Sequence, residues 1–272
     1  MIFRKTGWIQ QLGELSYEAW SGFLSLSLFV GSLTLSIWKA VKKPRSIRWR
    51  ETFYYMNSCG VDGLPITILI CFLTGIILGY QSAVQMQKYG AEVFLPMLVG
   101  CSIVRELGPI MVAIVATGRS GSAFAAEIGT MKISEELDAM KTMGFDPIHF
   151  LVIPKLIAMI TMIPLLTMVG NLVGVLGGFL VGYSELGMPF ETYLNLTQEG
   201  VDPKYVFEGL FKSVIFAVII TVTGCWRGFN TGSDAIAVGR STTSAVVFSI
   251  LFIIIADTVL AKFFSHIFNM GG

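Results

Sequence analysis

Apolar residues fall into long blocks along this chain, and short polar segments separate the blocks. Five blocks are mostly apolar: residues 61–85, 93–118, 156–183, 205–226 and 243–266. Each is longer than the roughly 20 residues that a helix needs to cross the hydrocarbon core of a bilayer. The pattern therefore predicts an all-α integral membrane protein with five transmembrane helices.

The first apolar segment, residues 19–41, differs from these blocks because serine and glycine dilute it. Arg4 and Lys5 precede it, and six basic residues lie between Lys39 and Arg50. Cytoplasmic flanks carry the excess of Lys and Arg, so a segment that is positive at both ends favours a helix in the inner interface. A sixth span through residues 19–41 is the alternative, and it would change the count of crossings.

Basic residues also set the expected topology. The segments 39–50, 119–155 and 227–240 carry most of the Lys and Arg, whereas residues 184–204 are acidic and are expected to form an outer loop with a short helix. With five spans, the positive-inside rule puts the N-terminus in the cytoplasm and the C-terminus outside.

Residues 119–154 gather charges that the neighbouring apolar blocks mostly exclude. Ser134 is a favourable N-cap, acidic residues follow it in the first turn, and Gly144 is a stop signal. The predicted helix, residues 135–143, is about 13 Å long at 1.5 Å per residue and is too short to cross a bilayer. We interpret it as a docking surface for a partner; a solvated connector is the alternative.

Composition agrees with a membrane protein and excludes several other classes. The chain has 272 residues, of which 54% are hydrophobic and 14% are charged, against about 25% charged residues in soluble domains. Its net charge of +1 gives no electrostatic footprint for nucleic acid. The four cysteines lack metal-site or disulfide spacing, and no HExxH, GxSxG or GxxxxGK[ST] motif occurs. We expect no metal site, no cofactor and no catalytic activity in this chain.

Several charged residues interrupt the apolar blocks, where each costs about 2.5 to 3.5 kcal/mol at a helix centre unless it is paired or faces water. They are Arg105, Glu106, Glu208, Lys212, Asp257 and Lys262. We expect them to form a polar layer in the outer half of the bilayer. Glu208 and Lys212 are four residues apart and can pair with each other. Arg105 and Glu106 are adjacent and point apart, so we expect their partners to come from other helices.

Glycines recur at every fourth residue in the third apolar block, at Gly170, Gly174, Gly178 and Gly182. Glycine costs about 1 kcal/mol against alanine inside a helix, so this smooth face predicts close packing against another helix or another subunit. Gly75 and Gly79 make a shorter step of the same kind.

A set of linked motifs resembles the MlaE permease family, the membrane subunits of ABC systems that move lipids together with MCE-domain proteins. The motifs are VRELGP at 104–109, GRSGSA at 118–123, AEIG at 126–129 and EELDAM at 135–140, followed by Met143-Gly144 and Asp146-Pro147. The resemblance covers nearly the whole chain from about Ser46.

The resemblance implies a homodimer in a bacterial inner membrane that moves phospholipid between the inner and outer membranes. It implies an interfacial helix in residues 1–50 and a permease domain in residues 51–272. Residues implied to line the lipid pathway are Glu106, Lys212, Arg105, Asp257, Leu78 and Tyr89. Residues implied to couple to the ATPase are Ser134, Glu135, Glu136, Asp138, Met140 and Lys141.

The implied partners are a cytoplasmic ATPase, which binds ATP and Mg²⁺, and a periplasmic MCE protein, expected as a hexamer. Two other functions stay open at this point. One is transport of a different hydrophobic substrate such as a sterol, and the other is transport of a small solute or ion. A membrane scaffold without transport has no use for the central Arg105 and Glu106.

Overall fold

The computed structural model describes residues 8–269, and in this range the chain forms helices and no strand. The α-helices are α1 (Trp8–Lys42), α2 (Trp49–Cys59), α3 (Leu64–Tyr89), α4 (Leu95–Ser102), α5 (Gly108–Ala116), α6 (Ser122–Ile133), α7 (Glu136–Thr142), α8 (Ile153–Leu186), α9 (Phe190–Gly200), α10 (Pro203–Phe229) and α11 (Ala235–Asn269). The predicted all-α membrane fold is confirmed.

The second span is longer than the apolar pattern indicates. Glu92–Ile133 forms one helical segment of 42 residues, in which two π-helical turns, η4 (Ile103–Leu107) and η5 (Thr117–Gly121), interrupt the α-helix. The sequence prediction ended this span at Gly118 because charge begins at Arg119. A charged residue does not end a helix, and the alanine-rich α6 has good helix propensity, so the helix continues.

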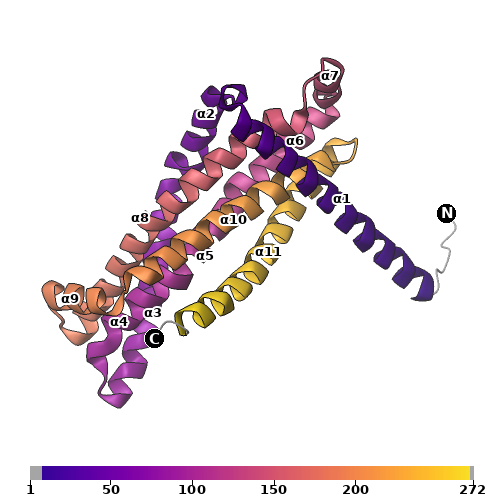
Figure 1. Ribbon diagram of the computed structural model, residues 1–272. Coiled ribbons are helices and arrows are strands. Elements are labelled where there is room, and N and C mark those ends of the chain that lie inside the picture. The colour runs from indigo at the N-terminus through magenta and orange to yellow at the C-terminus, as the bar shows by residue number, and fades with distance from the viewer. Residues whose placement is uncertain (1–7, 270–272) are drawn as a thin grey trace.

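The long helices lie alongside one another, and α7 and α9 lie at opposite ends of the bundle (Figure 1). The end that carries α7 also carries the turn between α10 and α11: Lys132 Nζ donates to Phe229 O at 2.9 Å. The basic segments that the sequence assigned to one side of the membrane are therefore at one end of the structure. The acidic segment that contains α9 is at the other end, and its predicted short helix is confirmed.

Helix α1 leaves the bundle at a steep angle instead of running beside the other long helices (Figure 1). Trp226 Nε1 donates to Ser25 Oγ at 3.1 Å, the rings of Phe29 and Phe229 are 5.8 Å apart, and Ser36 Oγ donates to Asp146 at 3.4 Å. All these partners lie at the α7 end. By length and composition six helical segments in residues 8–269 can span, α1 among them. The contacts favour a helix that lies across the end of the bundle.

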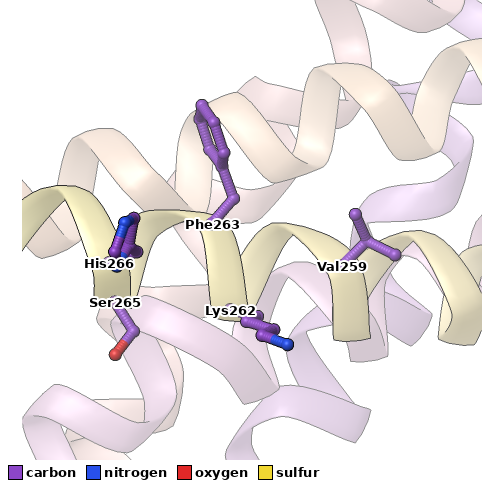
Figure 2. A pocket seen from close by; sticks show the side chains of 5 residues that line it. All are labelled: Val259, Lys262, Phe263, Ser265 and His266. Atoms are coloured by element: carbon purple, nitrogen blue, oxygen red, sulfur yellow. The ribbon is translucent and has the colours of Figure 1, made fainter.

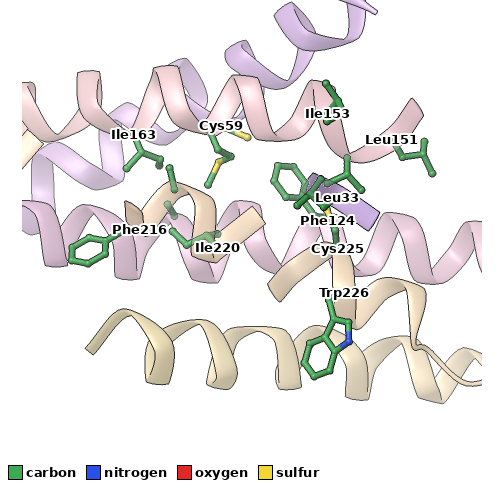
Figure 3. Packing of buried hydrophobic residues seen from close by; sticks show 14 of the residues in the cluster. Leu33, Cys59, Phe124, Leu151, Ile153, Ile163, Phe216, Ile220, Cys225 and Trp226 are labelled. Atoms are coloured by element: carbon green, nitrogen blue, oxygen red, sulfur yellow. The ribbon is translucent and has the colours of Figure 1, made fainter. Parts of the chain in front are cut away.

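The main apolar core lies between α1, α2, α6, α8 and α10. Figure 3 shows Cys59, Phe124, Ile163 and Ile220 directed toward this common centre, with Trp226 at its edge. All four cysteines are free thiols; Cys101 is partly exposed and the other three are buried. The core therefore joins the α1–α2 region to the spanning helices at the α7 end.

The glycine face of α8 lies against other helices of the same chain. A Cβ at Gly174 would lie 3.0 Å from Ile103 Cγ2, and one at Gly178 would lie 2.6 Å from Val99 Cγ1 and 2.7 Å from the Tyr193 hydroxyl. A Cβ at Gly170 would meet Cys71 Sγ at 2.8 Å, and one at Gly182 would meet the Tyr193 ring at 3.1 Å. The closest approach to a backbone atom is at Gly75, where a Cβ would lie 1.9 Å from Gly174 O. Helices α3 and α8 thus meet backbone to backbone.

We predict that the α9 end faces the periplasm and that the α7 end faces the cytoplasm. Thiol labelling can test this orientation, but native Cys59 is buried and does not reach a reagent. The C-terminal residues 270–272 lie outside the described range, so the labelling sites are chosen elsewhere. In a Cys101→Ser background, a cysteine at the exposed position Glu191 is expected to react with a membrane-impermeant thiol reagent in spheroplasts. A cysteine at the exposed position Lys141 is expected to react only after lysis. The opposite labelling pattern would refute the orientation.

Candidate functional site

Charged side chains from three parts of the chain meet between η4, α10 and α11. Lys212 Nζ lies 2.5 Å from Glu106 Oε2, 3.4 Å from Glu208 Oε1 and 3.3 Å from Asp257 Oδ1. Arg105 Nε lies 3.1 Å from Glu208 Oε2. The structure therefore brings together five of the charged residues predicted to form a polar layer, and we call them the five-residue cluster.

Glycine allows the helices that carry the cluster to approach closely. A Cβ at Gly209 would lie 2.2 Å from Val104 O, so only glycine lets the α10 backbone pass this close to η4. Helix α10 begins at a defined point, because the Asp202 side chain accepts from Lys204 N at 2.9 Å and Pro203 is the first helical residue. The start of α10 and its close approach to η4 together fix the position along the bundle at which Glu208 and Lys212 lie beside Arg105.

Burial differs sharply within the five-residue cluster. The side chains of Glu208 and Lys212 are 0% exposed, whereas those of Arg105 and Glu106 are 26% and 31% exposed. Two basic and three acidic groups give a formal charge of −1 when all are ionised. Glu106 is the most accessible carboxylate, so a cationic group that approaches the cluster meets Glu106 first.

Both predictions about pairing are confirmed, and the structure adds further contacts. Glu208 and Lys212 pair at 3.4 Å, and Lys212 also contacts Glu106 and Asp257, so it bridges carboxylates from three segments. Arg105 and Glu106 have the expected partners on α10, Glu208 and Lys212, and they also contact each other, with 3.6 Å between Arg105 Nε and Glu106 Oε1. Both side chains are long enough to bend toward the same point, which a comparison of helical directions alone does not take into account.

The other predicted pathway residues lie apart from the cluster. Leu78 is partly buried against the core formed by α3, α4 and α8, and Tyr89 is 84% exposed at the last residue of α3. Lys262 lies farther along α11 beside a hollow of about 510 Å³. Figure 2 shows that its five lining side chains all come from α11. With lining from a single helix, this hollow has no facing element to hold a ligand.

Helix α7 forms the candidate partner surface. Glu135, Glu136 and Asp138 are exposed, and Lys141 Nζ donates to Asp138 Oδ1 at 2.8 Å. This hydrogen bond is the main reason that the pKa of Asp138 lies below its usual value. The carboxylate is therefore ionised at neutral pH. Met143 and Phe145 are exposed beside these charges. The acidic surface thus includes two apolar side chains that the sequence analysis did not select.

Two predicted details of this helix were wrong. Ser134 is not its N-cap: α6 continues to Ile133, and Ser134 N donates to Thr130 O at the end of α6. Glu135 makes the turn instead, in the left-handed region with φ 60°, and α7 is Glu136–Thr142. Met140 is also not part of the exposed surface, because it is buried with Leu137 in the main core. These two residues hold α7 to the bundle.

A second buried charged group lies near α7, and the sequence analysis did not identify it. The Lys155 side chain is 0% exposed, and its Nζ lies 3.0 Å from Glu127 Oε1 and 2.8 Å from the Tyr55 hydroxyl. Tyr55 also donates to Glu127 at 2.6 Å. This network joins α2, α6 and α8. The signal in the sequence was a lysine directly before the third apolar block, which resembled an ordinary flanking charge.

The fold and the five-residue cluster define an integral membrane protein with charged groups inside an apolar helical bundle. A family model described as Permease MlaE matches residues 52–263. Because this range is more than half of the chain, the chain belongs to the MlaE permease family.

Individual relatives agree with the family model. A probable ABC transporter permease protein of Synechocystis is 40% identical over 215 residues, which are 79% of this chain and 82% of the relative. The intermembrane phospholipid transport system permease protein MlaE of Haemophilus influenzae is 33% identical over 206 residues, 75% of this chain and 79% of the relative. The chloroplastic protein TRIGALACTOSYLDIACYLGLYCEROL 1 of Arabidopsis thaliana is 33% identical over 260 residues, 93% of this chain and 73% of the relative.

We predict that Lys155→Met destabilises the protein because it leaves Glu127 and Tyr55 without their buried cation. Loss of one partner of a buried pair costs about 3 to 5 kcal/mol, and water at the partly exposed Glu127 places this variant near the lower limit. Thermal unfolding in detergent measures the effect. The control Lys141→Met removes an exposed pair, which is expected to cost less than about 1 kcal/mol. Equal melting temperatures for Lys155→Met and the wild type would contradict the prediction.

Proposed function

We propose that this chain is the membrane subunit of an ABC-type transporter that moves phospholipid between two membranes, and that the lipid headgroup contacts the five-residue cluster. The observation that supports this most is an acidic, partly exposed charged group inside an otherwise apolar bundle. A charged group in the hydrocarbon region costs free energy, so its presence indicates a function. In a phospholipid the charges are in the headgroup, so the headgroup is the part that such a cluster can bind.

The charge balance of the cluster favours a particular contact. Lys212 already has three carboxylate partners and is fully buried, so it has little capacity left for a lipid phosphate. Glu106 is accessible and belongs to a cluster with one excess acidic group. We therefore propose that Glu106 receives the amine of a zwitterionic headgroup, and that Lys212 and Arg105 position the carboxylates.

The name of the Haemophilus relative, which refers to intermembrane phospholipid transport, supports the substrate class. An uncharged sterol would make no use of the accessible Glu106. A small-solute pathway is expected to have broken helices with a polar lining, whereas here the segments around the cluster are apolar. A phospholipid fits both the charged cluster and the apolar surroundings.

We further propose that α7 is the coupling helix and docks on a cytoplasmic ATPase, which binds ATP and Mg²⁺. Its exposed acidic residues are followed in the chain by exposed Met143 and Phe145, and a combination of apolar anchors with polar groups is typical of interfaces. A homodimer in the bacterial inner membrane and a hexameric MCE-domain partner on the α9 side complete the proposed assembly.

We predict that Glu106→Gln lowers phospholipid affinity about tenfold, equivalent to about 1.4 kcal/mol, because the amide cannot form an ion pair with the headgroup amine. Phospholipid bound per mole of folded protein, measured by mass spectrometry after purification in detergent, is the readout. Glu185→Gln removes an exposed carboxylate near the α9 end and is the matched control. Lys212→Met is expected to lower the yield of folded protein, since three carboxylates lose their shared cation. Wild-type lipid occupancy in Glu106→Gln would refute the headgroup contact.

We predict that Glu136→Lys abolishes copurification of the ATPase while the protein still folds. Reversing a charge at an interface leaves groups unpaired and typically costs about 2 to 5 kcal/mol. Pull-down of the ATPase from membranes that contain both subunits measures the effect. Glu191→Lys makes the same charge change on α9, at the opposite end, and is expected to retain the partner. Retention of the ATPase by Glu136→Lys at wild-type stoichiometry would count against docking through α7.

A further inference from the structure

A second cavity lies at the α7 end of the molecule, between α1, α10 and α11. Its volume is about 730 Å³, in the range of about 300 to 1,000 Å³ that holds small-molecule ligands. Arg227 lies 15 residues after Lys212 on α10, which corresponds to about 22 Å along a helix. The cavity is therefore far from the five-residue cluster and does not belong to the proposed transport site.

Arg227 is the charged residue of this cavity, and its surroundings are unusual for a partly buried cation. Its guanidinium carbon lies 4.4 Å from the ring centroid of Trp226 and 4.1 Å from that of Phe248. Its Nε is buried and has no hydrogen-bond partner among the described residues. The two rings hold the guanidinium in position, and its Nε–H donor stays unused.

Other buried or partly buried basic residues of this chain have carboxylate partners. Lys155 has Glu127, Lys212 has three acidic partners, and Arg105 has Glu208. Among the side chains that the structure describes, no carboxylate lies within 4.0 Å of Arg227, and none of the residues that line the cavity is acidic. Because a partly buried guanidinium is stabilised by an anion, a cavity that opens on Arg227 suits an anionic ligand.

The lining also indicates which anion fits. A guanidinium matches a phosphate group with two parallel hydrogen bonds. Ser25 and Asn230 add polar atoms beside Arg227, whereas Phe23, Leu26 and Phe252 supply apolar walls. Ser25 Oγ accepts from Trp226 Nε1 at 3.1 Å, which holds α1 against α10 at the cavity. A phosphate next to an apolar chain is the chemistry of a glycerophospholipid.

We propose that this cavity binds a phosphate group through Arg227, and that the phosphate belongs to a phospholipid of the leaflet at the α7 end. The apolar walls take part of an acyl chain. The bound lipid contacts both α1 and α10, so it fixes α1 across the end of the bundle. This site does not depend on the proposed transport of lipid through the five-residue cluster.

The test is a lipid titration of the whole purified protein, followed by native mass spectrometry. Delipidated wild type is titrated with phosphatidylglycerol in detergent, and Arg227→Gln is expected to lose about tenfold in affinity for one bound lipid. The control Arg50→Gln removes an exposed positive charge from α2, and it is expected to match the wild type. Equal affinity in Arg227→Gln and the wild type would overturn the proposal.

A second pair of variants covers the case in which Arg227→Gln does not fold. Gly22 and Gly31 are both on α1, and a Cβ at either position meets nothing within 4 Å, but only Gly22 lines the cavity. Gly22→Phe is therefore expected to fill the cavity and reduce lipid binding, while Gly31→Phe is expected to bind as the wild type does. Equal lipid binding by these two variants would also overturn the proposal.

Competition separates the two sources of phosphate. Inorganic phosphate and glycerol 3-phosphate are added at millimolar concentration during the phosphatidylglycerol titration. Failure of both to displace the lipid supports a site that requires the acyl chain. If either compound displaces the lipid from the wild type but not from Arg227→Gln, the site binds a soluble phosphate. That result would overturn the lipid assignment.

Discussion

Hydrocarbon does not solvate charge, and this constraint explains where nearly every ionisable side chain of this protein lies. A buried cation must find an anion, and a buried polar group must find a hydrogen-bond partner. Lys212 meets this requirement with carboxylates from three segments, and Lys155 meets it with Glu127 and Tyr55. Both ion networks join helices that are distant in the sequence. Each therefore fixes the relative depth of its helices as well as neutralising charge.

Such networks form only where helices approach closely, and glycine provides that approach. Gly209 brings the α10 backbone next to η4, and Gly75 brings α3 next to α8. The π-helical turn η4 contains both Arg105 and Glu106. π turns inside α-helices occur often at functional sites, because an extra residue redirects the side chains of one turn. Local backbone irregularity and close packing thus act together at the five-residue cluster.

The sequence was sufficient to predict the architecture, because hydrophobic block length and the distribution of Lys and Arg are properties of the chain alone. It was also sufficient to select Arg105, Glu106, Glu208, Lys212 and Asp257, since charge in an apolar block is visible without a structure. Their full set of partners was not predictable. Whether Lys212 pairs with its helical neighbour Glu208 or also with Glu106 depends on which helices pack together, and helical spacing does not contain that information.

The errors near α7 have the same origin. Ser134 has the right residue type for an N-cap, but whether it begins one helix or ends the previous one depends on where α6 stops. Lys155 resembled a solvated flanking charge, and only the packing of α2 against α8 shows that it is buried. Arg227 was assigned to a loop, whereas α10 continues to Phe229 and places it beside α1. In each case a helix extends beyond its apolar block: the extension puts Ser134 at the end of α6, buries Lys155 and partly buries Arg227.

The position of the Lys155 network bears on how α7 can act on the rest of the molecule. Helix α7 lies between α6 and α8 in the chain, and Glu127 of α6 contacts Lys155 of α8 beneath it. Leu137 and Met140 fix α7 itself to the core. A force on α7 is therefore applied to α6 and α8 together, and Tyr55 extends the connection to α2. Because α6 is continuous with η5, α5 and η4, the helical segment that leads to α7 also contains Arg105 and Glu106.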